Sequence, residues 1–543
     1  MNPAAGKNLR QSDLRFERNL RLVSSVTAAS RLTGYFRDML NADLFGAGWI
    51  SDAYFAASRI PNFMQNLVSD GALLQAFVPT FSKILGKNKP KEAQAFMSQM
   101  FTFVLMAAGA ITVLGMVFSE KIVTVVAYGF TQQPEKFHLA AKLTLIIFPV
   151  FLLACMASLW MGILNSLHRF VMPAAATLAM NATLIMTGLA LWAGNRWGGW
   201  GLDTLTLVTI WTAATIPGMF LQWAVQWPEA ARLGFRLRLA WPSHPAMKEA
   251  LHLMAFALLS QSVLQINFLV NQFFASFLPN GYVTYIYYGT RLMQLPFGVL
   301  GVSIATISFP ILSQQAGRIR LGEFGGTLTR SLESAVFSTL PATVGLILIS
   351  EPLCRLAFQH GALTAEDSHR IAQATSLYLL GLVSSTCSKI LMTAYYAKQK
   401  PRLPLWASMV SFFINLLING SLFLFAKDGN IRFWGLALSA SLCSFLNLGI
   451  LLSGLPAMGV RLDWRRLGRS LVYAFGRTLA MALAVESALR TLLDFQPPGA
   501  VFWNAALPAL LGAGVYLGLA RLGSGLKSET GRKKTVPHPG ATR

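Results

Sequence analysis

Apolar runs of about twenty residues recur from one end of this chain to the other, and they constrain its fold more than any other feature. A helix of that length crosses the ~30 Å hydrocarbon core of a bilayer. The composition agrees, because 54% of the 543 residues are hydrophobic and 12% are charged, against about 25% charged residues in soluble domains. A membrane β-barrel would instead show segments of about ten residues with alternating polarity. The sequence therefore predicts an all-α polytopic membrane protein.

The apolar runs indicate about 14 transmembrane helices, several of them longer than the ~20 residues that a bilayer requires. The expected spans are 19–42, 50–86, 92–118, 138–166, 171–194, 203–227, 247–278, 282–315, 327–350, 368–397, 403–426, 432–455, 468–490 and 500–522. The second and eighth spans are the longest, so we expect them to tilt, kink or protrude.

Lys and Arg concentrate in the even-numbered connections and near both chain ends, which orients the spans by the positive-inside rule. The even-numbered connections hold Lys83, Lys87, Lys89 and Lys91, then His168 and Arg169, Arg232, Arg236, Arg238 and Lys248, Arg318 and Arg320, Lys398, Lys400 and Arg402, and finally Arg461, Arg465, Arg466 and Arg469. Both termini are therefore expected in the cytoplasm. The net charge of +23 reflects this topology, with attraction to anionic membrane lipids secondary, and does not indicate a nucleic-acid partner. We expect no cleavable signal peptide, because no small-residue cleavage site follows the basic N-terminus.

The strongly apolar stretch 30–82 carries several charged residues, among them Arg31, Arg37, Asp38, Asp52, Arg59 and Asp70. Charges at membrane depth are costly and usually face a watery cavity or a partner. The alternative is that they anchor helix ends at the interface, although several lie in the middle of a segment.

Helical geometry gathers the polar residues of this stretch into two stripes. At about 100° per residue, one stripe of about 80° holds Asp52, Arg59, Asn62, Asn66 and Asp70, and a second holds Ser24, Thr27, Arg31, Gly34 and Asp38. Arg37 and Gln65 lie off these stripes, and a kink at Pro61 makes the register beyond it uncertain. Two facing stripes would line a cavity.

The two halves of the chain resemble each other at a nearly constant offset. Tyr54 matches Tyr285 (285 − 54 = 231), Pro79 matches Pro310, Ser82 matches Ser313 and Pro173 matches Pro404 at the same offset, while Arg59 matches Arg291 and Gly129 matches Gly361 at 232. An even number of spans per copy gives both copies the same orientation, as in parallel-repeat transporters. We therefore expect two six-helix lobes related by a pseudo-two-fold axis along the membrane normal, with two additional C-terminal helices.

This division gives five expected regions. They are an N-lobe (1–227), a cytoplasmic linker (228–246), a C-lobe (247–455), a pair of spans outside the repeat (456–523) and a disordered basic tail (524–543). A cavity between the lobes is the expected binding site.

The expected cavity is positively charged. Span eight adds Arg291, and span ten contributes Lys389 as a further candidate. Guanidinium forks suit phosphate oxygens, so these residues predict an anionic substrate. The alternative for Arg291 is a structural pair with a backbone carbonyl.

At these residues the chain resembles the MurJ (MviN) family, lipid II flippases of the multidrug/oligosaccharidyl-lipid/polysaccharide exporter superfamily. The resemblance rests on ASRLTGYFRD (29–38), LFGAGWISDAYFAASRIPN (44–62), DGALLQAFVP (70–79) and YYGTRLMQLPFGVLGV (287–302), and it covers essentially the whole chain. It implies a flippase that moves lipid II, the lipid-linked peptidoglycan precursor, from the inner to the outer leaflet of the bacterial cytoplasmic membrane. It also implies that Arg31, Arg37 and Arg291 hold the diphosphate and that Asp38, Asp52 and Asn62 belong to the same site. Other cell-wall synthesis proteins are candidate partners.

The chain departs from the family pattern in three places. Gln65 and Asn66 stand where the family has an arginine shortly after Pro-Asn, Thr290 replaces an acidic residue, and Gln294 replaces a glutamate. These departures change the charge balance of the cavity, which Arg59 would partly restore. A second-lobe sodium site is not supported, because spans seven, eleven and twelve offer only Glu249.

Other functions remain open at this stage. The runner-up is a flippase for another polyprenyl-diphosphate-linked glycan, such as an O-antigen or capsule unit. A membrane enzyme acting on lipid diphosphates is a remote alternative, because such chemistry needs clustered acids with a metal, or a histidine, and nearly all of the seven histidines lie in expected loops or near span ends. The four cysteines have no metal-ligand or disulfide spacing, and Cys155, Cys387 and Cys443 are expected to be small buried residues.

We therefore expect no catalytic residue, no metal and no cofactor. No phosphate-binding GxxxxGK[ST] loop is present, so transport would draw on an ion gradient, the membrane potential at ~2.3 kcal/mol per charge per 100 mV, or consumption of substrate on the far side.

Overall fold

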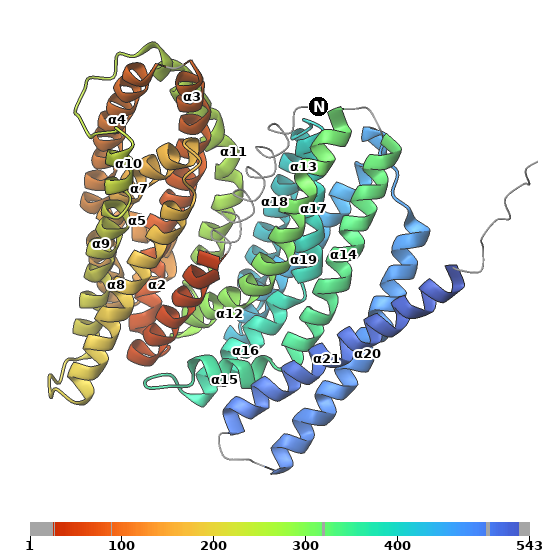
Figure 1. Ribbon diagram of the computed structural model, residues 1–543. Helices are drawn as coiled ribbons and strands as arrows, with labels where there is room; N and C mark the ends of the chain where they lie inside the picture. Colours follow the sequence, from red (N-terminus) through yellow and green to blue (C-terminus); the bar gives the residue numbers. More distant parts are fainter. Residues whose placement is uncertain (1–24, 27, 88, 318–320, 496–499, 532–543) are drawn as a thin grey trace, which may run out of the picture. The chain divides into compact units, whose positions relative to one another are not determined.

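The computed structural model describes residues 25–531 except 27, 88, 318–320 and 496–499, and within that part of the chain it contains helices and no strands (Figure 1). This confirms the all-α fold class. A helix over residues 28–45 precedes those labelled in Figure 1. The labelled α-helices and short η segments are α2 (Trp49–Met64), η1 (Gln65–Leu73), α3 (Leu74–Gly86), α4 (Pro90–Val117), α5 (Ser119–Val126), η2 (Tyr128–Gln132), α6 (Pro134–Ile147), α7 (Pro149–Ser166), α8 (Val171–Arg196), α9 (Thr204–Ala224), α10 (Trp227–Arg232), α11 (Pro245–Ala275), α12 (Tyr282–Pro296), η3 (Phe297–Val302), α13 (Ser303–Gly317), α14 (Leu321–Leu348), α15 (Ser350–Phe358), α16 (Ala365–Leu379), α17 (Leu382–Ala397), α18 (Arg402–Phe425), α19 (Gly429–Ser453), η4 (Pro456–Met458), α20 (Trp464–Phe495) and α21 (Ala500–Gly531).

Ten helical segments among the described residues are long and apolar enough to cross a membrane, or eleven if the bent pair α16–α17 is one span. The chain is therefore a multi-span membrane protein. The expected spans 19–42, 50–86 and 247–278 are not in this set, so the count of 14 stays a prediction. Helix α21 continues to Gly531, which carries helical structure into the region 524–543 expected to be a disordered tail.

The chain forms two compact units. The first comprises the described residues up to Tyr285 together with Phe358–Asp367 and Gly420–Phe433, and the second comprises the rest. Helix α11 packs against α3 and η1 in the first unit, although the sequence assigned residues 247–278 to the second lobe. Two hydrogen bonds hold the later segments of the first unit, from the Tyr285 hydroxyl to Asp367 Oδ1 (2.6 Å) and from the Tyr282 hydroxyl to Asn430 Oδ1 (2.8 Å). The predicted lobe boundaries stay a prediction.

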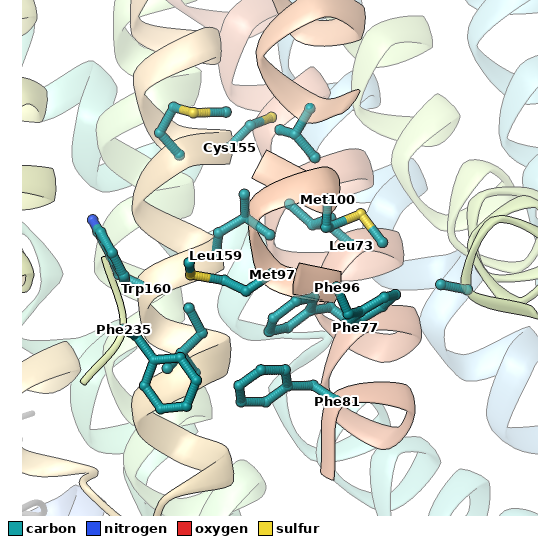
Figure 2. Close-up of a cluster of buried hydrophobic side chains, with 14 of the residues drawn as sticks. Leu73, Phe77, Phe81, Phe96, Met97, Met100, Cys155, Leu159, Trp160 and Phe235 are labelled. Atoms are coloured by element: carbon teal, nitrogen blue, oxygen red, sulfur yellow. The ribbon is translucent and has the colours of Figure 1, made fainter. Parts of the chain in front are cut away.

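Side chains from α3, α4, α7 and the α10–α11 connection form the main core of the first unit, and several of them are aromatic (Figure 2). The Phe77 ring stacks on Phe81 and Phe96 at centroid separations of 5.0 and 5.7 Å, and Phe235 meets Phe81 edge-on at 5.5 Å. A Cβ at Gly162 of α7 would lie 2.8 Å from the Phe77 ring, so this glycine permits the close approach. Small residues at helix contacts are typical of membrane proteins, where van der Waals packing drives association.

The second unit has its own core, which α13, α14, α17 and η4 build around Phe324, Leu328, Ile390 and Tyr395. Helices α20 and α21 pack on α14 through a smaller cluster that includes Ile349, Met481 and Tyr516. The four cysteines are free and buried, which confirms the expectation for Cys155, Cys387 and Cys443.

A π-helical segment interrupts the corresponding long helix of each half. Segment η1 (Gln65–Leu73) separates α2 from α3, and η3 (Phe297–Val302) separates α12 from α13. The two segments begin 232 residues apart (297 − 65), which is the offset of the sequence repeat. Each follows a proline inside the preceding helix, Pro61 or Pro296. A proline removes an intrahelical hydrogen bond and crowds the preceding turn, so the local geometry must change there.

Two loop glycines make matching contacts in the first unit. Gly129 donates its backbone N–H to Ser276 Oγ (2.9 Å), just beyond the end of α11. Its counterpart Gly361 lies against Asp43, near the end of helix 28–45, and the next residue, Ala362, donates its N–H to the Asp43 carbonyl (2.9 Å). A Cβ at either glycine would overlap the backbone oxygen of the residue it meets. The loop of each sequence half therefore contacts the end of the other half's first helix.

Candidate functional site

Arg37 is held by two side chains in the first unit. Its Nε and Nη2 both donate to Asp38 Oδ1, at 3.1 and 2.7 Å, and its Nη1 donates to Asn181 Oδ1 of α8 at 3.2 Å. The Asn181 amide in turn donates to the Ser30 carbonyl at 3.1 Å. Asp38 is buried and Arg37 is half-buried. Charge-assisted hydrogen bonds of this kind fix the plane of the guanidinium.

The other predicted residues of the first unit differ in their surroundings. Arg31 and Asn62 are exposed. Arg59 is half-buried, and its guanidinium carbon lies 6.0 Å from the centroid of the Phe268 ring of α11, within the range of a cation–π contact. Protein groups contact the side chains of Arg37, Asp38 and Arg59. The side chain of Arg31 is exposed.

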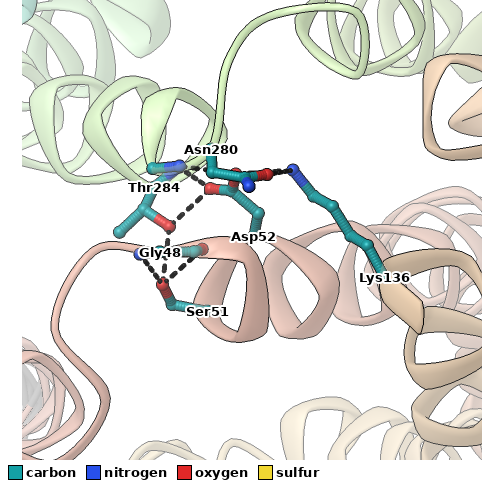
Figure 3. A network of polar contacts seen from close by, with 7 residues as sticks. Gly48, Ser51, Asp52, Lys136, Asn280 and Thr284 are labelled. Atoms are coloured by element: carbon teal, nitrogen blue, oxygen red, sulfur yellow. Dashed lines mark hydrogen bonds and ion pairs between the residues drawn. The ribbon is translucent and has the colours of Figure 1, made fainter. Parts of the chain in front are cut away.

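Asp52 lies at the centre of a polar network that sequence analysis did not anticipate (Figure 3). It accepts hydrogen bonds from Lys136 Nζ (2.8 Å), from the backbone N–H groups of Gly281 (2.8 Å) and Thr284 (2.9 Å), and from the Thr284 hydroxyl (2.8 Å). Lys136 also donates to Asn280 Oδ1 (3.0 Å) and lies 4.3 Å from the centroid of the Phe130 ring.

Both charges of this network are removed from water. Asp52 is 0% exposed and Lys136 is 1% exposed. The carboxylate of Asp52 caps the first turn of α12, where the positive end of the helix dipole stabilises an anion. A buried charge without its partner is strongly destabilising, so the network binds α2, α6 and the start of α12 together. In this conformation the Asp52 oxygens are occupied by protein donors.

Lys136 and Asn181 are the residues that sequence reasoning missed. Lys136 precedes the expected span 138–166 and lies within the first turn of α6. Asn181 is the one amide side chain in the expected span 171–194, which otherwise holds apolar residues and threonines. The local sequence around Lys136 does not indicate that this lysine is buried. Its partners, Asp52 and Asn280, are far away in the sequence.

Arg291 lies in α12 within the second unit and is half-buried. Of the family departures, Thr290 is half-buried and its hydroxyl donates to the Ile286 carbonyl (2.8 Å), Gln294 is exposed, and Gln65 begins η1. Lys389 is exposed. The convergence of Arg31, Arg37, Arg59 and Arg291 on one cavity stays a prediction.

The expected polar stripe of the second span does not have a uniform environment. Asp52 is fully buried, whereas Asn62 and Asn66 are exposed. The π-helical segment η1 begins at Gln65 and changes the angular spacing of the residues beyond it. The side chain of Asp70 lies outside the described residues. Among the described residues, no three His, Cys, Asp or Glu side chains are grouped to hold a metal ion.

Comparison with known proteins identifies the family. The sequence profile described as "Lipid II flippase MurJ" matches residues 41–500. The chain belongs to the MurJ family.

MurJ proteins from several bacteria match over most of their length. The chain is 32% identical to the probable lipid II flippase MurJ of Buchnera aphidicola subsp. Acyrthosiphon pisum over 432 residues, which cover 79% of this chain and 81% of the relative. It is 31% identical to the lipid II flippase MurJ of Burkholderia cenocepacia over 450 residues, with 82% and 84% covered. The relatives are named as flippases, not as enzymes.

Solved structures agree with this assignment. A lipid II flippase MurJ in an inward closed conformation matches with a TM-score of 0.75 at 25% identity, covering 92% of this chain and 98% of that one. An inward-facing MATE family transporter of the MOP superfamily matches with a TM-score of 0.62 at 14% identity, covering 80% and 98%. The second likeness shows a shared fold.

Proposed function

We propose that this MurJ family member moves lipid II from the inner to the outer leaflet of the bacterial cytoplasmic membrane by alternating access, without catalysing a chemical reaction. The observation that carries the proposal is the family match over residues 41–500, because it spans both halves of the duplicated sequence. The relatives that carry the name lipid II flippase are covered over four-fifths of their own length.

The arginines supply the chemistry for an anionic headgroup. A diphosphate offers paired oxygens that match the planar fork of a guanidinium. Arg37 is preorganised by Asp38 and Asn181, so little side-chain freedom is lost when it binds an anion. Arg31 and Arg291 complete the predicted set, and Arg59, Asp38, Asp52 and Asn62 belong to the same predicted site.

The Asp52 network supports a second part of the proposal, which concerns conformational change. Its four donors come from α6 and from the start of α12. Movement of α12 away from α2 would break the contacts of Gly281 and Thr284 and leave the carboxylate with Lys136 alone. We assign this network the role of stabilising one state of the transport cycle. The distribution of Lys and Arg supports a cytoplasmic location of both termini.

Complementation of a flippase-depleted bacterium tests the proposal. The wild-type chain should restore growth and bring lipid II to the outer leaflet, measured by its accessibility to an externally added enzyme. Arg31→Ala, Arg37→Ala and Arg291→Ala should each abolish rescue at unchanged protein levels. Arg490→Ala is the matched control, because Arg490 is exposed and its ion-pair partner among the described residues is Glu486, one helical turn away (3.0 Å). Full growth with all three variants would refute the proposed site.

The same experiment separates the alternatives. Good expression without rescue would favour a flippase for another polyprenyl-diphosphate glycan. The departures from the family pattern at Gln65, Thr290 and Gln294 are the reason to test this alternative. Gln65→Arg then tests whether the missing cation is responsible. Release of inorganic phosphate from lipid II by the purified chain would instead indicate an enzyme.

A further inference from the structure

One exposed face at the start of α20 forms a cavity of about 640 Å³ that the proposed transport function does not use. Its lining residues follow one another at helical spacing. They are Trp464, Arg465, Gly468, Arg469, Val472 and Tyr473. Residues four apart lie on the same face of a helix, so two rows run along the helix, Trp464–Gly468–Val472 and Arg465–Arg469–Tyr473.

The two arginines of this face differ from their neighbours on the same helix. Arg466 pairs with Glu333 of α14 (2.8 Å), and the guanidinium of Arg477 lies over the Phe337 ring (5.8 Å). Arg465 and Arg469 are exposed and form no ion pair or hydrogen bond with another described residue. Two like charges one helical turn apart repel each other, and an anion between them would relieve that repulsion.

Gly468 lies between these arginines and leaves a notch in the helix surface. Glycine within a helix is less stable than alanine, and no contact accounts for it here, because a Cβ at this position would meet nothing within 4 Å. Its missing side chain instead opens the floor of the cavity between Trp464 and Val472. The position therefore leaves room for a ligand group beside the helix.

The position of the face along the chain indicates which ligands can reach it. The preceding connection is one of the basic, even-numbered connections, so the start of α20 lies on the predicted cytoplasmic side. Arg465 and Arg469 are about 6 Å apart along the axis at 1.5 Å per residue, comparable to the ~5–8 Å headgroup layer on each side of the hydrocarbon core. Trp464 and Tyr473 are residue types that concentrate in this layer.

We propose that this face of α20 binds the phosphate of an anionic phospholipid from the cytoplasmic leaflet. The two guanidinium groups would hold the phosphate oxygens, Gly468 would admit the headgroup, and Val472 and Tyr473 would contact the start of the acyl chains. A zwitterionic lipid has the same phosphate but also presents a cation to the two arginines. The site shares no residue with the predicted transport site, so it stands or falls independently of the proposed function.

Photo-crosslinking tests the site directly. The full-length chain is reconstituted in phosphatidylcholine vesicles that contain a trace of photoactivatable phosphatidylglycerol, and labelling of the peptide that contains residues 464–473 is measured by mass spectrometry. The double variant Arg465→Gln/Arg469→Gln should reduce labelling of this peptide by about 25-fold, since each cation near an anionic surface contributes roughly a factor of five. Gly468→Leu should also abolish labelling without lowering the melting temperature, because leucine is the better helix former.

The control variant and the competitors define what would overturn the proposal. Arg490→Gln removes one charge from the other end of α20 and should leave labelling unchanged. Unlabelled phosphatidylglycerol should compete, whereas added phosphatidylcholine and inorganic phosphate should not. Unchanged labelling in the double variant or in Gly468→Leu would overturn the site. An equal loss of labelling in Arg490→Gln would also overturn it, because the labelling would then depend only on the overall positive charge of the protein. Competition by phosphatidylcholine or free phosphate would overturn the assignment of the ligand.

Discussion

A single lysine illustrates how the role of a charge depends on partners far away in the sequence. Lys136 precedes an expected span and carries no motif, yet it is 1% exposed and bonded to Asp52 and Asn280. The intramembrane-charge rule singled out Asp52 correctly as an unusual residue. The rule could not identify Lys136 as the partner of Asp52, because the two residues are 84 positions apart in the sequence (136 − 52).

Removal of Lys136 tests the importance of this network. Lys136→Met should destabilise the chain by about 3–5 kcal/mol, because it leaves the buried carboxylate of Asp52 without its counter-charge. Thermal unfolding in detergent measures the loss. Lys121→Met is the control, since Lys121 is exposed and its charge lies 5.2 Å from the centroid of the Phe118 ring, and it should change stability little.

A double variant separates the charge from the packing. Asp52→Asn combined with Lys136→Met removes both charges and should recover much of the stability lost in the single variant. Equal instability of the single and double variants would contradict the ion-pair explanation. It would mean instead that packing around the lysine stem dominates.

At the scale of elements, the sequence predicted the two long interrupted spans but not the form of the interruption. Pro61 and Pro296 indicated kinks, and each is followed by a π-helical segment. A proline shows where the hydrogen-bond ladder must change. Whether the chain bends or widens into a π-helix depends on the neighbouring helices, and η1 packs on α7 and α11, which a local pattern does not reveal.

The loop around Gly361 provides a test at this scale. Gly361 has a φ of +56°, and a Cβ there would overlap the Asp43 backbone. Gly361→Ala should therefore lower the melting temperature more than Gly199→Ala, because Gly199 has a similar φ of +64° but open space around it. Both substitutions bear the left-handed backbone strain of about 1–2 kcal/mol. Equal losses would show that only this strain matters and that the contact with Asp43 does not.

At the scale of the whole molecule, composition and repeat were enough to predict an all-α membrane transporter with an internal duplication. The residues that carried the family resemblance, from 29 to 79 and from 287 to 310, lie mostly within the matched range 41–500. The number of spans could not be fixed in the same way. Charged and broken segments such as 50–86 do not pass a test of length and apolarity, although they contain candidate functional residues.

Reporter fusions test the predicted topology. Alkaline phosphatase, which is active only outside the cytoplasm, should be active when inserted at residues 496–499 and inactive when fused after Arg543. A fluorescent protein that matures only in the cytoplasm should give the opposite result. Phosphatase activity at both positions would contradict the even number of spans that places both termini on one side.

The matching contacts of Gly129 and Gly361 bear on the origin of the chain. Gly129 meets Ser276 and Gly361 meets Asp43, and the two pairs are related by offsets of 232 and 233 residues (361 − 129 and 276 − 43). Reciprocal contacts of this form, in which i meets j and j meets i, define an isologous interface between two identical subunits. Before gene fusion, a six-helix ancestor could have made both contacts as a symmetric dimer with exchanged loops. In the fused chain each loop still contacts the other half. A half expressed alone would therefore lack the residue that its loop contacts.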